Sequence, residues 1–203
     1  MTEPLRVLAL GCTLKPSPAA SSSDLIAGQL LDLFGRHGAV GELVRVVDHD
    51  VKPGVEADMG DGDEWPALRR KIHDADILLV ATPTWLGHLS SVAQRVLERL
   101  DAELSETDDH GRPALFGKVA VAAVVGNEDG AHKIIADLFQ ALNDTGFTIP
   151  APGGTYWNGE AMRGGDYNDL DETPEAVAST NATLVRNAVH LANLLRDHTY
   201  PAA

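Results

Sequence analysis

The sequence predicts a single α/β domain built on a five-stranded parallel sheet with helices on both faces. Short apolar runs alternate with segments of helical periodicity along the 203 residues, a pattern typical of βαβ units with right-handed crossovers. Two of the runs, 76–81 and 118–125, are almost wholly apolar, as in central strands that helices cover on both sides. A chain of this length buries one sizeable core, so we expect one domain over 1–203.

The individual elements follow from apolar periodicity and from capping residues. Ser23 or Asp24 is the expected N-cap of the first helix, and Ser90 or Ser91 begins the third. A long loop, 151–174, precedes the last helix. The strands are expected at 5–10, 42–47, 76–81, 118–125 and 147–150, and the helices at 25–36, 65–73, 90–104, 131–143 and 175–196.

Composition excludes several classes of function. The formal charge of −14 and the pI near 4.8 disfavour nucleic acid and anionic membrane surfaces as partners. Cys12 is the single cysteine, so no intramolecular disulfide forms; a buried apolar role is the default for it and a redox role the alternative. Because the chain shows neither a basic leader nor a run of about 20 apolar residues, we expect a soluble, cytoplasmic protein.

In a doubly wound sheet, ligands bind beyond the carboxyl ends of the strands. The loop after the first strand, 11–23, places five hydroxyls and one lysine before a helix N-terminus. The N–H groups and dipole of a helix start favour an anion, and short hydroxyls add donors. The loop therefore suits a phosphate, and the alternative is a serine-rich cap in a solvated loop.

Other phosphate-binding patterns are missing from the sequence. There is no G-x-x-x-x-G-K-[ST], and no G-x-G-x-x-G follows the first strand, which argues against a nucleoside triphosphatase and a Rossmann site. A response regulator would need an acidic pocket with a phosphoacceptor Asp at a strand end, where this chain has Cys12-Thr13 and Thr82-Pro83. The acidic stretch 58–64 lacks the Glu that a calcium loop requires at its twelfth position, so we expect no metal site.

The loops after the third and fourth strands carry the most specific pattern, Thr82-Pro83-Thr84-Trp85-Leu86-Gly87-His88 and Gly126-Asn127-Glu128-Asp129-Gly130. Together with the first loop, they make the chain from residue 5 to about 142 resemble the NAD(P)H-dependent FMN reductases of the flavodoxin-like superfamily. The resemblance implies a flavodoxin-like sheet of strand order 2-1-3-4-5, FMN as cofactor, NADPH or NADH as reductant, and a homodimer. In that family a T-P-x-[aromatic]-x-G segment wraps the isoalloxazine ring.

The resemblance also assigns residues to FMN by position. Family members commonly have Ser after the glycine of the first loop and Arg further on, where this chain has Cys12 and Lys15; Lys keeps the charge but not the planar fork of Arg. The implied phosphate and ribityl contacts are Thr13, Lys15, Ser21, Ser22 and Ser23, the implied ring contacts are Pro83, Thr84, Trp85, Leu86 and Gly87, and Gly126, Asn127, Glu128, Asp129 and Gly130 flank the other edge of the ring.

Side-chain chemistry agrees with this assignment but leaves alternatives open. Trp85 offers a flat apolar surface for a flavin; a single Trp is more often a core or interface residue, but the neighbouring residues of Trp85 favour the flavin. Glu128 and Asp129 can instead favour the N-terminus of the following helix. His88 and His132 either hydrogen-bond the flavin or guide the nicotinamide, or they are solvated surface residues.

The long loop 151–174 interleaves aromatic residues with glycines. A loop of this length and composition suggests a lid or a subunit contact over the active site, with Trp157 or Tyr167 as candidate contacts across a dimer interface. The alternative is an ordered surface excursion without a ligand.

We therefore expect an FMN-dependent oxidoreductase that transfers hydride from NADPH or NADH to bound FMN and then to a small-molecule electron acceptor, such as a quinone, a flavin, a nitro compound or an azo dye. Because the cofactor carries the chemistry, we expect no catalytic side chain. Two alternatives remain. One is a flavodoxin-type electron-transfer protein without NAD(P)H activity of its own, whose acidic surface would suit basic redox partners; the other is a doubly wound binding module without flavin.

Overall fold

The computed structural model describes residues 3–160 and 164–201. Its strands are β1 (Arg6–Gly11), β2 (Val40–Arg45), β3 (Ile77–Trp85), β4 (His88–Leu89), β5 (Val119–Gly126) and β6 (Gly154–Asn158). Its helices are α1 (Ser22–Arg36), α2 (Trp65–Asp74), α3 (Ser91–Leu100), α4 (Ala131–Asp144) and α5 (Glu175–Asp197), with short 3₁₀ turns η1 (Val46–Asp48), η2 (Asp101–Ser105) and η3 (Tyr167–Asp169).

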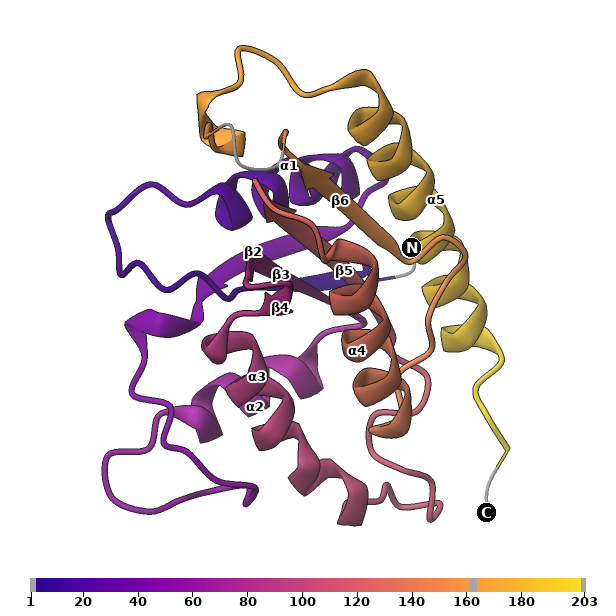
Figure 1. The fold of residues 1–203 in the computed structure, drawn as a ribbon. Coiled ribbons are helices and arrows are strands. Elements are labelled where there is room, and N and C mark those ends of the chain that lie inside the picture. The colour runs from indigo at the N-terminus through magenta and orange to yellow at the C-terminus, as the bar shows by residue number, and fades with distance from the viewer. Residues whose placement is uncertain (1–2, 161–163, 202–203) are drawn as a thin grey trace.

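The sheet has the predicted parallel architecture. Its order is β2-β1-β3-β5-β6, and the short β4 pairs antiparallel with the end of β3. Helices α1 and α5 cover one face, and α2, α3 and α4 cover the other (Figure 1). This is a doubly wound arrangement, in which the chain reverses direction across the sheet between β1 and β3.

The two central strands are buried on both faces, as their apolar sequences predict. β5 is buried from Val119 to Val125, and β3 is buried from its start through Thr82. Successive side chains of a strand point to opposite faces, so Val80 packs in the cluster that holds Trp65 of α2, whereas Leu79 packs with α1 and α5. These rigid strands hold the loops at their carboxyl ends.

The fifth parallel strand lies later in the chain than predicted. At the expected position, 147–150, an isolated bridge joins Thr148 to Val119. Pro150 and Pro152 lack the N–H group that a continuous ladder needs, and regular pairing resumes in β6, whose first residue Gly154 aligns with Ala122. The strand prediction at 147–150 was therefore wrong, and the predicted loop 151–174 contains a strand.

The first helix begins earlier than predicted. Ser21, and not Ser23 or Asp24, is its N-cap, and the Ser21 Oγ accepts a hydrogen bond from the Asp24 N–H at 3.2 Å. The N–H groups of Ser22 and Ser23 consequently fall in the first helical turn, where a helix has no acceptor of its own for them. The shift therefore brings two more backbone donors to the loop that was predicted to bind a phosphate.

Further boundaries differ. β3 does not end at residue 81 but continues to Trp85, so most of the predicted loop 82–88 is strand, and β2 ends at Arg45 and not at residue 47. β2 begins at Val40, in register with Arg6 of β1, and not at residue 42. After Leu100 the chain tightens into η2 instead of continuing α3 to residue 104. In the part of the chain that the structure describes, no helix is long and apolar enough to cross a membrane.

A buried ion pair fixes the acidic connection between η1 and α2. The Arg99 guanidinium donates to both carboxylate oxygens of Asp63, at 3.0 and 2.8 Å, and both side chains are fully buried. The same group donates to the carbonyls of Lys52 and Glu56 and lies 5.5 Å from the ring centroid of Trp65. Asp63 is therefore a structural anchor of this acidic stretch.

Candidate functional site

A cavity of about 160 Å³ lies beyond the carboxyl ends of β1, β3 and β5. The switch point of a doubly wound sheet is expected to bind its ligand here, and all three predicted loops meet at it. The predicted residues that line the cavity are Thr13, Lys15, Ser21, Ser22, Ser23, Pro83, Thr84, Trp85, Gly126 and Asn127. The others, Leu86, Gly87, Glu128, Asp129 and Gly130, lie in the turns that follow these segments.

The first loop presents hydroxyl and N–H donors at the start of α1. The Oγ atoms of Ser21 and Ser23 lie 3.2 Å apart, and Thr13 Oγ1 accepts a hydrogen bond from the Lys15 N–H at 3.2 Å. The dipole of α1 adds partial positive charge at the same place. This end of the cavity is therefore suited to an anion such as a phosphate.

Arg45, at the end of β2, organises the first loop, and sequence reasoning missed it. Its Nε donates to Asp24 Oδ2 at 2.7 Å, and its terminal nitrogen donates to the carbonyls of Lys15 and Ala19 at 3.2 and 2.8 Å. The Arg45 and Asp24 side chains are 13% and 12% exposed. A planar guanidinium bonds its acceptors in a fixed geometry, so Arg45 restricts the loop to one shape.

Asp48 of η1 provides a second restraint on the same loop. Its two carboxylate oxygens accept hydrogen bonds from the backbone N–H and the hydroxyl of Ser17, at 2.8 and 2.5 Å. These bonds to Ser17 hold the pKa of Asp48 below its usual value of 3.8, so the carboxylate is ionised at neutral pH. The middle of the first loop, at Ser17, is thereby attached to η1.

The segment predicted to contact the ring is the end of β3 and a tight hairpin turn. Leu86 and Gly87 are the central residues of the turn, with φ of 52° and 73°, and a type I′ turn requires positive φ at both. Trp85 pairs with His88 across the hairpin. Trp85 is 53% exposed and Leu86 88% exposed, so the hairpin presents an apolar surface beside the cavity.

The third loop, 126–130, touches this hairpin directly. A Cβ atom on Gly130 would lie 2.7 Å from the Cα of Gly87, closer than non-bonded carbon atoms approach. The carboxylate of Glu128 accepts a hydrogen bond from the Leu86 N–H at 2.9 Å. The second and third loops therefore form one connected structure.

Thr84 places an unpaired polar atom in the cavity wall. Its Oγ1 is buried and has no hydrogen-bond partner among the described residues, although buried hydroxyls are normally bonded. Thr84 packs against the backbone of Gly126, where a Cβ atom would fall 2.8 Å from the Thr84 Cβ. A ligand with a polar group near Thr84 would complete this wall, so the residues present fit such a ligand.

Trp157 and Tyr167, from the long loop expected over the active site, both line the cavity. Their rings pack on each other with centroids 5.5 Å apart, and Tyr167 is 2% exposed. A side chain buried in its own chain cannot contact a partner, so the expectation of a dimer contact was wrong for Tyr167. In the sequence, the interleaved aromatic residues and glycines of the loop 151–174 were the signal that this loop contributes to the site. The lining residues not predicted are Leu14, Val125, Trp157, Asp166 and Tyr167.

The two histidines and the cysteine near the site are not among the described residues that line the cavity. His88 Nδ1 lies 2.8 Å from the Leu86 carbonyl oxygen, and His132 Nε2 lies 3.1 Å from the Tyr156 hydroxyl. Cys12 is fully buried, and burial raises the pKa of its thiol far above the usual range. The buried apolar role expected for Cys12 is the one that the structure shows.

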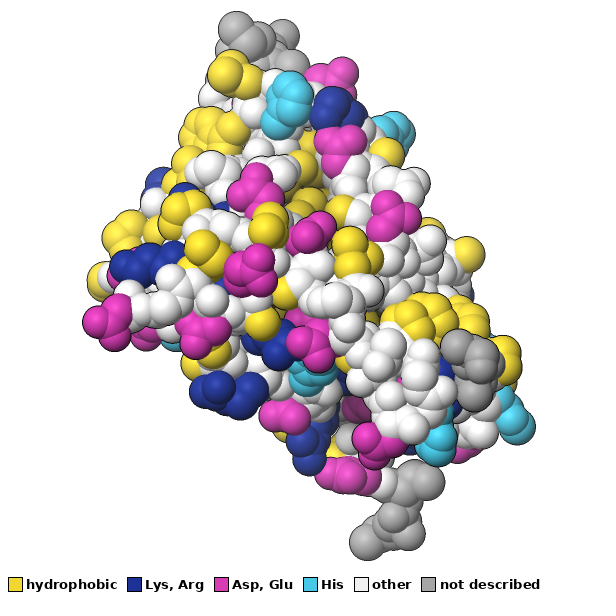
Figure 2. Space-filling model, turned by 90° about the horizontal axis from the view of Figure 1, so that it is seen from below, with side chains coloured by type: hydrophobic (Ala, Val, Ile, Leu, Met, Phe, Trp, Pro, Cys, Tyr) yellow, Lys and Arg dark blue, Asp and Glu magenta, His cyan; other side chains and the backbone are white. Residues whose placement is uncertain are grey.

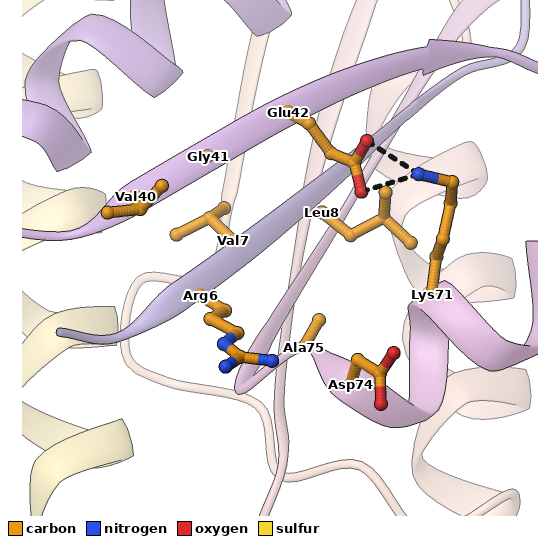
Figure 3. A pocket seen from close by; sticks show the side chains of 9 residues that line it. All are labelled: Arg6, Val7, Leu8, Val40, Gly41, Glu42, Lys71, Asp74 and Ala75. Carbon is orange, nitrogen blue, oxygen red and sulfur yellow. Dashed lines mark hydrogen bonds and ion pairs between the residues drawn. The ribbon is translucent and has the colours of Figure 1, made fainter. Parts of the chain in front are cut away.

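A larger hollow, of about 280 Å³, lies at the other end of the sheet, between the starts of β1 and β2 and the end of α2 (Figure 3). On its wall, Lys71 Nζ contacts both carboxylate oxygens of Glu42, at 2.9 and 2.7 Å. Volume does not decide between the two hollows, because doubly wound sheets bind ligands at the carboxyl ends of their strands. The smaller cavity, with its converging donors, is the candidate site.

The strand order, the hydroxyl-rich loop before α1 and the aromatic hairpin at the switch point define a flavodoxin-like α/β protein. Residues 5–162 match the family model of the NADPH-dependent FMN reductases. The chain belongs to this family of flavin-dependent oxidoreductases, as the sequence pattern had indicated.

Two named proteins that are similar to this chain make or bind a flavin phosphate, as their names state. The chain is 33% identical over 208 residues to 8-demethyl-8-aminoriboflavin-5'-phosphate synthase of Streptomyces davaonensis, covering 97% of this chain and 80% of that protein. The crystal structure of RosB with the bound intermediate 8-demethyl-8-formylriboflavin-5'-phosphate superposes with a TM-score of 0.88 at 32% identity, covering 97% of this chain and 82% of that one.

A third relative is much longer than this chain. The chain is 38% identical over 199 residues to a protein of Mycobacterium bovis named divalent metal cation transporter MntH, and the match covers 95% of this chain but 29% of that protein. The similarity thus concerns less than a third of the relative.

Proposed function

We propose that the chain binds FMN in the cavity at the carboxyl end of the sheet and uses it to pass a hydride from NADPH or NADH to a small acceptor, such as a quinone or a free flavin. The convergence of three loops on one cavity carries this proposal. The first loop offers donors for a phosphate, and the exposed Trp85 offers a surface for an aromatic ring. Membership of the FMN reductase family supports the same chemistry.

Each loop has a separate task in this proposal. Thr13, Lys15 and the serines 21–23 hold the phosphate and the ribityl chain, where charge and backbone donors meet. The hairpin 83–87 lies against the isoalloxazine ring, and the third loop, 126–130, borders its other edge. FMN supplies the two-electron chemistry when bound, and the residues of the chain orient it and exclude water.

An anaerobic titration tests the proposed reaction. The FMN-loaded protein is mixed with NADPH, and separately with NADH, while the visible absorbance of the flavin is followed. Rapid loss of absorbance with either nucleotide is the expected result. If dithionite removes the absorbance and neither nucleotide does, the reductase proposal fails and the electron carrier takes its place. Failure of the purified chain to bind FMN overturns both.

The charge distribution gives the carrier little support on one face of the molecule. Figure 2 shows that face, where acidic side chains are interleaved with basic and hydrophobic ones. A carrier that docks through electrostatic complementarity benefits from a continuous acidic patch. The interleaved pattern on this face offers none.

A second candidate function treats the flavin phosphate as substrate. The relative from Streptomyces davaonensis is named for the synthesis of an aminoriboflavin phosphate, and the RosB structure holds a formylriboflavin phosphate as an intermediate. A cavity that accepts riboflavin 5'-phosphate can serve either role. Conversion of the flavin would need an oxidant and an amino donor, so the FMN-loaded protein is incubated in air with an amino donor and the flavin is then analysed by mass spectrometry. An unchanged FMN mass supports the cofactor role, and a changed mass supports the substrate role.

We also propose that the chain is a homodimer in a reducing compartment, in keeping with the family resemblance and with the single buried cysteine. Light scattering coupled to size-exclusion chromatography tests the oligomeric state. A mass equal to one chain of 21.6 kDa would rule out the dimer.

A further inference from the structure

We infer that residues 166–173, called the strap from here on, form the wall of the cavity next to the phosphate loop, and that Tyr167 and Gln29 are the positioning residues that hold the strap there. The inference rests on the proposed binding of FMN in this cavity. It adds that the strap sets how strongly the chain prefers the phosphorylated flavin over riboflavin.

The strap is attached to α1 by one glutamine. The Tyr167 hydroxyl donates a hydrogen bond to Gln29 Oε1 at 2.7 Å, and Gln29 Nε2 donates to Thr173 Oγ1 at 3.0 Å. Both ends of the strap are therefore bound to the same side chain of α1. The Tyr167 ring is buried and packs on Trp157 of β6, which anchors the strap in the core.

The strap also meets the phosphate loop itself. The Asn168 N–H donates to Ser22 Oγ at 3.4 Å, and Asp166 and Tyr167 line the same cavity as Ser21 and Ser22. In Figure 1 the strap, coloured orange, passes close to the beginning of α1. The strap therefore borders the donors that the proposal assigns to the phosphate.

Two of the four acidic residues of the strap, Asp166 and Asp169, are bonded to the strap's own backbone. Asp166 and Asp169 form a reciprocal capping box, in which each carboxylate accepts the other residue's N–H; the bond from the Asp166 N–H is 2.7 Å long. A wall that excludes water strengthens hydrogen bonds between the loop and a phosphate. Loosening the strap should weaken these bonds more than the contacts with the ring.

Tyr167→Phe tests this inference because it removes the hydroxyl and keeps the buried ring. We expect the Kd for FMN to rise about fivefold to tenfold, and the Kd for riboflavin, which has no phosphate, to change by less than about twofold. Gln29→Ala removes both bonds to the strap and should shift the ratio of the two Kd values in the same direction. Quenching of flavin fluorescence on binding measures both ligands.

Tyr200→Phe is the matched control. The Tyr200 hydroxyl lies 2.9 Å from Thr148 Oγ1, and neither residue is among those that line the cavity in the described chain, so both affinities should stay unchanged. Equal rises of the two Kd values in Tyr167→Phe would indicate a general loss of structure and overturn the inference, and so would unchanged values. If the wild-type chain does not bind FMN, the proposed function itself fails, and this inference with it.

Discussion

The carboxylate of Glu128 accepts a hydrogen bond from the backbone N–H of Leu86 at 2.9 Å and thereby joins the third loop to the β3–β4 hairpin. Leu86 needs such a restraint because its φ is 52°, in a region that costs a residue with a Cβ atom about 1–2 kcal/mol. The Leu86 carbonyl is engaged as well, by the His88 ring. The turn beside the cavity is thus held through both polar groups of one residue.

Glu128→Ala should weaken FMN binding about fivefold, because the hydrogen bond that fixes the hairpin contributes about 1 kcal/mol. Glu128→Gln keeps an acceptor oxygen and should retain most of the affinity. Isothermal titration calorimetry of the three proteins with FMN measures the difference. An alanine variant that binds as tightly as the wild type would show that the hairpin keeps its shape without Glu128.

Arg45→Lys should weaken FMN binding about tenfold, because Lys keeps the charge but not the fork that bonds three acceptors. Riboflavin binding should change less, since the first loop is assigned to the phosphate. Arg70→Lys, at an exposed position on α2, is the matched control. Equal losses for FMN and riboflavin would place the effect of Arg45 outside the phosphate loop.

Lys15→Ala should weaken FMN binding several-fold at low salt, and the loss should shrink as the ionic strength rises, because an exposed charge is screened by salt. Riboflavin should bind the variant as it binds the wild type. Dissociation constants at two salt concentrations provide the measurement. Unchanged FMN affinity would remove Lys15 from the phosphate contacts.

Gly130→Ala should lower the free energy of unfolding by about 2 kcal/mol or more, because the new Cβ atom meets the Gly87 backbone at 2.7 Å and φ at Gly130 is 135°. Gly28→Ala on α1 is the matched control, since its Cβ atom would meet nothing within 4 Å. That variant should gain up to about 1 kcal/mol from helix propensity. Urea unfolding measures the change in the free energy of unfolding for both variants. Equal changes would contradict the close approach of the β3–β4 hairpin and the loop 126–130.

Arg99→Met should lower the free energy of unfolding by about 3–5 kcal/mol, because it leaves the Asp63 carboxylate buried without its partner. Lys133→Met is the control: it breaks an ion pair whose side chains are 52% and 42% exposed, and should cost less than about 1 kcal/mol. Urea unfolding at neutral pH measures both, and equal losses would contradict the burial of the Arg99 pair.

The same pair gives a pH dependence of defined sign. Burial alone would raise the pKa of Asp63, but the hydrogen bonds from Arg99 and from three backbone N–H groups hold it well below its usual value of 3.8. A carboxylate with a lowered pKa in the folded state stabilises the protein above its unfolded pKa and loses that contribution as the pH falls. The wild type should therefore lose stability below about pH 4, and Asp63→Asn should lose less over the same range.

The sheet could be predicted because its central strands are apolar throughout. The runs 76–81 and 118–125 can be recognised as the strands β3 and β5 without tertiary information, because a strand buried on both faces is apolar at nearly every position. The edge strand β6 was missed for two reasons. Buried and solvent-facing residues alternate along it, so it has no continuous apolar run. It also follows two prolines, Pro150 and Pro152, which delay regular pairing with β5. The short hydrophobic run before them was the more conspicuous signal.

The site was predicted in its loops but not in the residues that shape them. Glycines and hydroxyl-bearing residues indicate a ligand-binding loop in the local sequence, because they are needed at the binding position itself. Arg45 and Gln29 act through partners distant in sequence: Arg45 is 26 residues from Ala19 and Gln29 is 138 from Tyr167. Such contacts depend on how the layers pack, which one sequence does not disclose.

The position of Arg45 on β2 has a consequence for the sheet margin. β2 is the outermost strand beside β1, and its first four residues are exposed, so it belongs to the part of a fold that opens most readily. Detachment of β2 would take Arg45 away from the first loop, and the loop would lose the three hydrogen bonds that restrain it. A molecule that binds only the shaped loop opposes this detachment by mass action. Occupancy of the cavity and fraying of the sheet margin are therefore linked equilibria.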